Sequence, residues 1–241
     1  MILQNKNVLI TGATGGLGRA LAREFVKNGS NLFLTGTDSS KLEQLKTDLQ
    51  SENTFDRKIK YEKCDLSNEG FVVQFIEKVK STFGSIDVLV NCAGVFPVKS
   101  LADTSLEEYK KCIQVNLNTP FALIKNFSQD MIKNKWGRII NIASSSAYAG
   151  GPLTSTYCAS KHGLLGLSRS LYQELKTKGV RVMVVSPGSI KTEMGREVEK
   201  LGQTYDTFME PSEIASYVVY NASFDGNLVC EELRLNRLEV R

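Results

Sequence analysis

Ligands for a metal ion are scarce in this sequence. It has one histidine, His162, and no two of its five cysteines stand in a CxxC pair. A structural zinc site usually needs four Cys, His or acidic ligands, most of them at short spacings. We therefore expect no metal site, and we expect free thiols, which suit a reducing compartment. The cysteines are Cys64, Cys92, Cys112, Cys158 and Cys230.

Long apolar runs and clustered charges are also missing. No run approaches the ~20 apolar residues that span a bilayer, and the start, MILQNKNVLITGATGG, has none of the three regions of a signal peptide. The net charge is only +4 and the Lys and Arg residues are not gathered in a run, so nucleic acid is not indicated as a partner. With 41% hydrophobic and 23% charged residues, the composition is that of a globular protein. We expect a cytoplasmic protein with no membrane or nucleic-acid partner.

Short apolar segments alternate with longer helical patterns over most of the chain. Segments such as VLI, DVLV and RIINI are apolar nearly throughout, which is typical of a parallel sheet covered on both faces. We predict strands at 8–11, 31–35, 59–63, 86–91, 138–142, 181–186 and near 233–235, and helices that include 17–28, 41–50, 69–83 and 106–115. Alternation of this kind predicts an α/β fold, a doubly wound parallel sheet (Rossmann fold) in three layers. No repeat or linker divides residues 1–241, so we predict one domain.

The least regular stretch follows the sixth predicted strand. It reads PGSIKTEMGREVEKLGQTYDTFMEP and is rich in charged residues and glycine. In a doubly wound fold it leaves the carboxyl end of a strand, where ligands bind. We predict a substrate lid at 190–210; the alternative is a plain surface excursion.

A glycine-rich turn stands between the first predicted strand and the first predicted helix, in VLITGATGGLGRALAREF. Gly12, Gly16 and Gly18 can adopt positive φ and allow close approach of a backbone or a ligand. The N–H groups at the start of a helix, together with its dipole, favour a pyrophosphate. At this place in a βαβ chain the TGxxxGxG spacing predicts dinucleotide binding; the alternative is a turn that is merely tight.

Seven motifs occur in order along the chain, namely TGATGGLG, CDLS at 64–67, NCAG at 91–94, Asn116, Ser144, YCASK at 157–161 and PGSIKT at 187–192. In this series the chain resembles the short-chain dehydrogenase/reductase family, in its compact single-domain branch, and within it the 3-oxoacyl-(acyl-carrier-protein) reductases. The resemblance implies an NAD(P)-dependent oxidoreductase that transfers hydride between a nicotinamide and a carbonyl or secondary alcohol.

The resemblance also implies the catalytic residues. Tyr157 stands at the position of the general acid–base, with Lys161 one helical turn later. A neighbouring ammonium favours the phenolate, so we expect Lys161 to lower the pKa of Tyr157. Ser144, thirteen residues before Tyr157, would donate to the substrate oxygen, and Asn116 would help to hold Lys161 through a water. The alternatives are a loop serine for Ser144 and a helix-interior amide bonded to backbone for Asn116.

Further residues are implied to bind the cofactor. Asp65 would contact adenine, but it could instead cap the helix that follows. Asn91 would line the adenosine–ribose region with Ala93 and Gly94, or it could tie strand ends together. The backbone of Ile190 and the side chain of Thr192 would hold the carboxamide, and Lys161 would also donate to the nicotinamide ribose. The complete implied set is Gly12, Thr14, Gly15, Gly16, Leu17, Gly18, Thr37, Asp65, Leu66, Asn91, Ala93, Gly94, Tyr157, Lys161, Pro187, Gly188, Ile190 and Thr192.

The end of the second predicted strand, LFLTGTDSS, bears on the choice of cofactor. NAD enzymes usually place an acidic residue there to bind the ribose 2′-OH. In family register that place is Gly36, Thr37 stands where many NADP enzymes have arginine, and Asp38 comes too late. Gly15 lacks the basic side chain that NADP enzymes often carry in the glycine turn. A missing carboxylate removes the repulsion of a 2′-phosphate, so we predict that NADP(H) is favoured over NAD(H).

The substrate is less determined. The core resembles reductases of acyl thioesters, whereas the end, DGNLVCEELRLNRLEVR, departs from their usual C-terminal segment. The alternatives are a dehydrogenase of small 3-hydroxy acids or of sugars and polyols, and, in a different class, a nucleotide-binding regulator or scaffold without turnover. The family commonly forms homodimers or homotetramers through the helices of Asn116 and Tyr157. Leu164, Leu165, Leu167 and Leu171 could serve that contact or a core-facing stripe.

Overall fold

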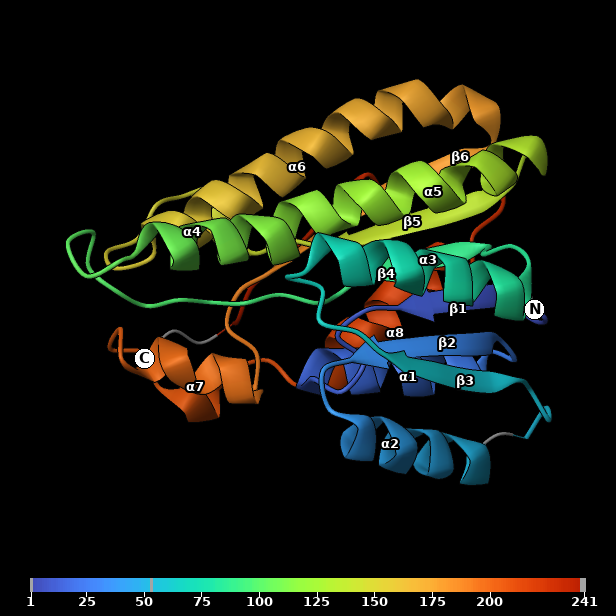
Figure 1. The fold of residues 1–241 in the computed structure, drawn as a ribbon, viewed down its shortest axis with the longest axis horizontal. Helices are drawn as coiled ribbons and strands as arrows, with labels where there is room; N and C mark the ends of the chain where they lie inside the picture. The colour runs from blue at the N-terminus through green and yellow to red at the C-terminus, as the bar shows by residue number, and fades with distance from the viewer. Residues whose placement is uncertain (1, 53, 239–241) are drawn as a thin grey trace.

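The fold is a seven-stranded parallel sheet between two layers of helices (Figure 1). The computed structural model describes residues 2–52 and 54–238. The strand order is β3-β2-β1-β4-β5-β6-β7, and every neighbouring pair is parallel. The strands are β1 (Asn7–Ile10), β2 (Asn31–Gly36), β3 (Ile59–Lys63), β4 (Val88–Asn91), β5 (Gly137–Ile142), β6 (Val180–Pro187) and β7 (Glu232–Leu235). The predicted doubly wound α/β fold in a single domain is confirmed.

The helices cover both faces of the sheet. One face carries α1 (Gly16–Lys27), α2 (Ser39–Ser51) and α8 (Pro211–Ala222), whose apolar residues join the inward side chains of the strands in one core cluster. The other face carries α3 (Glu69–Phe83), α4 (Leu106–Ile113), α5 (Thr119–Lys133) and α6 (Ser155–Leu175). A short helix, α7 (Glu193–Glu199), stands apart in the segment after β6. None of the described helices is both long and apolar enough to cross a membrane.

The predicted helix at 106–115 differs from the observed one at its end. Ser105 begins α4 with a capping box that includes Glu108, but the α-helical pattern stops at Ile113. A π-helical turn over Gln114–Asn118 then leads directly into α5. Such turns widen the helix by one residue and often stand at functional sites. Hydrophobic periodicity does not reveal them, because the chain continues along nearly the same axis.

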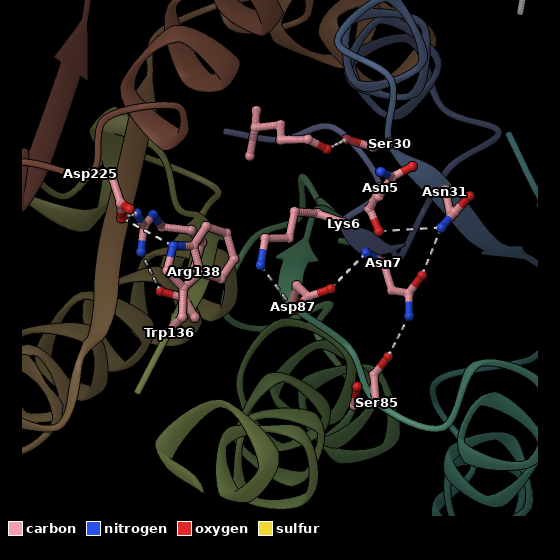
Figure 2. Close-up of polar contacts among 12 residues, drawn as sticks. Asn5, Lys6, Asn7, Ser30, Asn31, Ser85, Asp87, Trp136, Arg138 and Asp225 are labelled. Carbon is pink, nitrogen blue, oxygen red and sulfur yellow. Dashed lines mark hydrogen bonds and ion pairs between the residues drawn. The ribbon is translucent and has the colours of Figure 1, made fainter. Parts of the chain in front are cut away.

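At the amino ends of the strands, Arg138 of β5 is buried and lies beside Trp136 and Asp225 (Figure 2). Its guanidinium donates to the carbonyls of Ala222 and Phe224, at 3.2 and 2.8 Å, and to the Asp225 carboxylate at 2.7 Å. The Trp136 indole also donates to Asp225, at 3.0 Å. Because the last carbonyls of a helix have no intrahelical partner, these bonds anchor α8 and the segment that leads to β7.

Replacing Arg138 by Ala should therefore destabilise the fold. The change removes the donor of the buried Ala222 carbonyl, and a buried acceptor left without a donor costs about 1–3 kcal/mol. Arg23→Ala is the matched control, because its pairs with Asp48 and Glu52 are largely exposed and should contribute less than about 1 kcal/mol. Urea unfolding of both variants measures the difference. Equal losses would contradict the anchoring role of Arg138.

Candidate active site

The predicted site residues converge at the carboxyl edge of the sheet. The strand order reverses beside β1, because β2 and β3 lie on one side of it and β4 to β7 on the other. In open α/β sheets ligands bind at such a reversal, just beyond the carboxyl ends of the strands. The segments that leave β1, β2, β4, β5 and β6 carry nearly all of the predicted cofactor and catalytic residues.

The glycines of the first turn allow close approach of neighbouring backbone. Gly12 has φ +63°, and a Cβ there would lie 2.7 Å from the Cα of Ala93. A Cβ on Gly18 would lie 2.2 Å from the Gly12 carbonyl oxygen, and one on Gly16 would lie 2.6 Å from the Thr192 methyl group. The prediction that all three can use positive φ was right only for Gly12. Gly16 and Gly18 lie within α1, where glycine is required for space.

The start of α1 presents its N-terminal N–H groups at the surface. Gly15 is the N-cap residue and is exposed, with no side chain to bond the free N–H groups. Leu17, in contrast, points into the core, so only its backbone is available to a ligand. A twelve-residue helix that begins with uncapped N–H groups is suited to a pyrophosphate. The turn therefore fits the dinucleotide that the sequence implies.

Thr11 was missed by the sequence analysis, although it directly precedes Gly12. Its hydroxyl accepts hydrogen bonds from the backbone N–H groups of Cys92 and Ala93, both at 3.1 Å. These bonds join the end of β1 to the segment after β4. They hold Ala93 at the distance that only a glycine at position 12 permits.

At the tip of β2, none of Gly36, Thr37 and Asp38 offers a free carboxylate. Gly36 is buried, and a Cβ there would lie 2.8 Å from the Thr14 hydroxyl. Thr37 is exposed. Asp38 is the N-cap of α2, and its carboxylate accepts from the Lys41 N–H at 3.0 Å. That hydrogen bond lowers the pKa of Asp38, so the nearest acid is ionised but engaged with its own helix.

Asp65 does not cap α3, so that alternative was wrong. The cap is Asn68, which accepts from the Phe71 N–H. Asp65 is exposed and accepts from the backbone and hydroxyl of Ser67, at 3.0 and 2.7 Å, because its short side chain reaches the residue two positions on. Leu66 is buried in the core, and its carbonyl accepts from Thr119.

Asn91 joins neighbouring strand ends, as the alternative to ligand binding proposed. Its amide donates to the Asn141 side chain of β5 at 2.8 Å. Its own Oδ1, however, is buried and has no hydrogen-bond donor among the described residues. Most buried polar atoms have a partner, so this oxygen leaves an acceptor available to a donor of a ligand or a water.

Lys161 is buried beside the end of β5. Its Nζ donates to the Ile142 carbonyl at 2.8 Å, and only 4% of the residue is exposed. Burial lowers the pKa of Lys161 to about 8. A Cβ on Gly94 would approach this Nζ to 3.7 Å. Gly94 therefore leaves the space beside the amine clear of side chains, as a ribose contact would require.

Tyr157 lies one turn before Lys161 and is 8% exposed. Its ring packs edge-on against Phe96, with ring centroids 4.6 Å apart, and the Lys161 Nζ lies 5.6 Å from its centroid. The predicted lowering of its pKa was wrong. Burial raises the pKa of Tyr157 to about 12, and the interaction with the Ser144 side chain opposes this only in part. Desolvation of the phenolate is the largest cause of this shift.

Ser144 and Asn116 lie near this pair. Ser144 begins the 3-10 turn after β5, and its Oγ accepts from the Ser146 N–H at 3.1 Å. Asn116 lies in the π-turn and bonds the backbone of Val95 in both directions, at 2.9 and 3.0 Å. It also donates to the Ser160 hydroxyl at 3.0 Å. The alternative of a backbone-bonded amide is thus correct for its side chain.

The segment after β6 returns to the glycine turn. The Gly188 N–H donates to Leu235 of β7 at 2.8 Å, directly after Pro187. Thr192 caps α7 by accepting from the Gly195 N–H at 3.0 Å, and its methyl group lies against Gly16. Ile190 forms an isolated bridge with Met209. The two ends of the region predicted as a lid, 190–210, are therefore joined to each other by this bridge.

Sequence comparisons identify the family of the chain. The profile of the family described as short chain dehydrogenase matches residues 6–201. The chain is 35% identical over 234 residues to a 3-oxoacyl-(acyl-carrier-protein) reductase of Rickettsia felis, covering 94% of this chain and 93% of the relative. It is 31% identical over 240 residues to a D-beta-hydroxybutyrate dehydrogenase of Rhizobium meliloti, covering 92% and 93%.

Solved structures show the same arrangement of the whole chain. A metagenomic short-chain oxidoreductase in complex with NADP has 30% identity and a TM-score of 0.86, covering 99% of this chain and all of the other. An alcohol dehydrogenase of the archaeon Thermococcus sibiricus, complexed with 5-hydroxy-NADP, has 27% identity, a TM-score of 0.86 and 99% coverage of both chains. The protein belongs to the short-chain dehydrogenase/reductase family and is an NAD(P)-dependent oxidoreductase.

Proposed function

We propose that this oxidoreductase uses NADPH to reduce the carbonyl group of a 3-oxoacyl thioester to the alcohol. The observation that carries the proposal is the gathering of Tyr157, Lys161 and Ser144 at the end of β5, beside the glycine turn that fits a dinucleotide. The likeness to the 3-oxoacyl-(acyl-carrier-protein) reductase of Rickettsia felis supports the substrate class.

Each residue has a separate task in the proposed reaction. Tyr157, whose raised pKa keeps its proton in place, gives that proton to the carbonyl oxygen as negative charge develops there. The Ser144 hydroxyl donates to the same oxygen. Lys161 stabilises the phenolate that remains after this proton transfer and binds ribose hydroxyls, and Asn116 holds the neighbouring backbone segment through Val95. When bound, the nicotinamide supplies the hydride.

The preference for NADPH follows from the tip of β2. Gly36 has no side chain to repel a 2′-phosphate, and the Asp38 carboxylate caps α2. Thr37 is exposed and has a hydroxyl to donate. Asp65, Asn91, Ala93 and the segment from Pro187 to Thr192 would hold the adenosine and carboxamide ends as the family resemblance implies.

The segment 190–210 would act as a lid over the substrate. Its two ends meet at the Ile190–Met209 bridge and at the ion pair between Lys191 and Glu210, which are 2.7 Å apart. Between these ends lie α7 and one short turn. A loop that is paired at its base and leaves the carboxyl end of a strand is well placed to close over a ligand.

The chain would work as a homodimer or homotetramer in the cytoplasm. Leu106 and Tyr109 of α4 and Phe121 of α5 are exposed apolar side chains on the helices that the family uses for pairing. Leu164 and Leu165, in contrast, are buried within the subunit. The five cysteines are free thiols, which persist in a reducing compartment.

A second candidate substrate is a small 3-hydroxy acid, favoured by the likeness to the D-beta-hydroxybutyrate dehydrogenase of Rhizobium meliloti. Sugars and polyols are a further class of candidate substrates. Oxidation of NADPH or NADH in the presence of acyl-thioester, β-keto acid, sugar and steroid carbonyls compares these classes directly. Preference for the free acid over the thioester would move the assignment to the second candidate.

Tyr157→Phe should lower kcat by about 10²–10⁴-fold, because it removes the proton donor and leaves the ring in place. Binding of NADPH, measured by its fluorescence, should be nearly unchanged. Tyr172→Phe on the same helix is the matched control and should retain full activity. An unaltered rate in Tyr157→Phe would overturn the assignment, and absence of turnover with any carbonyl would favour a nucleotide-binding scaffold.

The rate of carbonyl reduction should depend on pH through Lys161. Burial lowers the pKa of Lys161 to about 8 and raises that of Tyr157 to about 12. The lysine is charged below its pKa and loses that charge as pH rises, whereas the phenol keeps its proton. We therefore expect kcat/KM to be level below about pH 8 and to fall above it. A profile that stays level to about pH 10 would contradict this assignment.

The KM for NADPH should be at least about tenfold below that for NADH. Gly36→Asp should reverse the order, because a carboxylate there repels the 2′-phosphate and accepts from the 2′-OH. Gly36→Ala is the control, since its Cβ meets the same Thr14 hydroxyl at 2.8 Å without adding charge. Equal KM values in the unmodified protein, or the same shift in both variants, would contradict the preference.

A further inference from the structure

The turn that carries Ser144 ends at a tyrosine with unusual surroundings. Ser144 begins the turn, the Ala147 N–H donates to the Ser144 carbonyl at 2.9 Å, and the Tyr148 N–H donates to the Ser145 carbonyl at 3.1 Å. Tyr148 therefore closes the turn that Ser144 opens. A movement of the Tyr148 backbone would displace this turn, since Tyr148 is bonded to Ser145 and its neighbour Ala147 to Ser144.

The Tyr148 phenol is fixed by charged groups from two other elements. It donates to the Glu232 carboxylate of β7 at 2.7 Å. The same carboxylate accepts from Arg169 of α6, at 2.5 and 3.2 Å. The guanidinium of Arg234 lies 4.2 Å from the centroid of the Tyr148 ring, and that of Arg169 lies 5.8 Å from it. Charge-assisted, bidentate bonds of this kind are stronger and more directional than neutral ones.

The strand β7 connects this cluster to the core. Glu232 and Arg234 lie in register with Val184 and Ser186 of β6, and residues two apart on a strand share a face. The intervening Leu233 and the following Leu235 pack against the core on the other face. The edge strand β7 thus packs against the core through one face. Its other face binds the Ser144 turn through the hydrogen bond between Glu232 and Tyr148.

The cluster also links the two catalytic segments. Arg169 lies twelve residues after Tyr157 on the same helix, α6. Glu232 binds Arg169 and Tyr148 with one carboxylate, so it ties the helix of Tyr157 to the turn of Ser144. The Ser144 side chain interacts with Tyr157 and favours its phenolate, so this interaction depends on the relative position of the two segments.

We propose that Glu232 and Tyr148 are positioning residues that hold the Ser144 turn against the helix of Tyr157. The proposal rests on the catalytic roles assigned above to Ser144 and Tyr157. It gives a task in the reaction to the C-terminal strand, which lies more than 70 residues beyond Tyr157 in the sequence. Neither residue touches the reacting groups, and both act through Ser144.

The test is a double-mutant cycle between Ser144→Ala and Tyr148→Phe. Tyr148→Phe removes one hydroxyl and keeps the ring beside the two guanidiniums. We expect it to lower kcat about tenfold, since a bond to a charged group is lost, with the KM for NADPH unchanged. Added to Ser144→Ala, it should lower kcat no further, because its effect passes through the serine. Glu232→Gln, which keeps an acceptor and removes the charge, should act in the same direction.

A pH profile separates positioning from a general loss of stability. Alcohol oxidation requires the phenolate of Tyr157, and Ser144 favours that form. In Tyr148→Phe and Glu232→Gln the rise of kcat/KM with pH should therefore move to higher pH, as in Ser144→Ala. Glu174→Gln is the control, because it breaks an exposed pair with Lys178 at the far end of α6, and its profile should match that of the unmodified protein.

The outcomes distinguish the positioning role from the proposed function on which it rests. Non-additive kcat values and a shifted profile support the positioning role. A loss in Ser144→Ala with an additive or absent effect of Tyr148→Phe overturns it and leaves the proposed function intact. Full activity in Ser144→Ala overturns both the role of the serine and the positioning role that depends on it.

Discussion

The site depends on one hydrogen bond, from the buried amine of Lys161 to the Ile142 carbonyl at the end of β5. A buried amine without a partner would cost several kcal/mol, so the start of α6 must lie where this carbonyl can serve it. Tyr157 is one helical turn before Lys161, and Ser144 follows Ile142 by two residues. A single strand end and a single helix therefore set the spacing of all three side chains.

The backbone segment from Cys92 to Val95, next to this pair, is held by two separate sets of hydrogen bonds. Thr11 binds the N–H groups of Cys92 and Ala93, and Asn116 binds Val95 in both directions. The segment between these anchors contains Gly94, which leaves the space beside Lys161 clear. Phe96, directly after it, packs on Tyr157. The π-turn thus places the Asn116 side chain where it reaches the Val95 backbone in the segment after β4.

Burial changes the electrostatics that the sequence suggests. One helical turn between a lysine and a tyrosine predicts a lowered pKa for the phenol. In the folded chain both groups are removed from water, so both are shifted toward their neutral forms. The phenol is thereby kept as a proton donor, which suits reduction of a carbonyl. The extent of desolvation depends on residues far from either group in sequence, such as Phe96, and spacing alone does not reveal it.

The sequence by itself determined the alternation of strands and helices, the glycine turn and the order of the motifs, because these depend on local periodicity and on residue types at fixed spacings. Hydrophobic pattern placed β1 to β7 within a few residues. Only the tertiary structure decided which glycine needs positive φ, that Asn68 and not Asp65 caps α3, and that Glu232 meets Tyr148. The cap of α3 depends on where the local turn at Asp65–Ser67 gives way to the helix. The other two depend on how closely two distant segments approach, and that distance is set by packing of the sheet and helices as a whole.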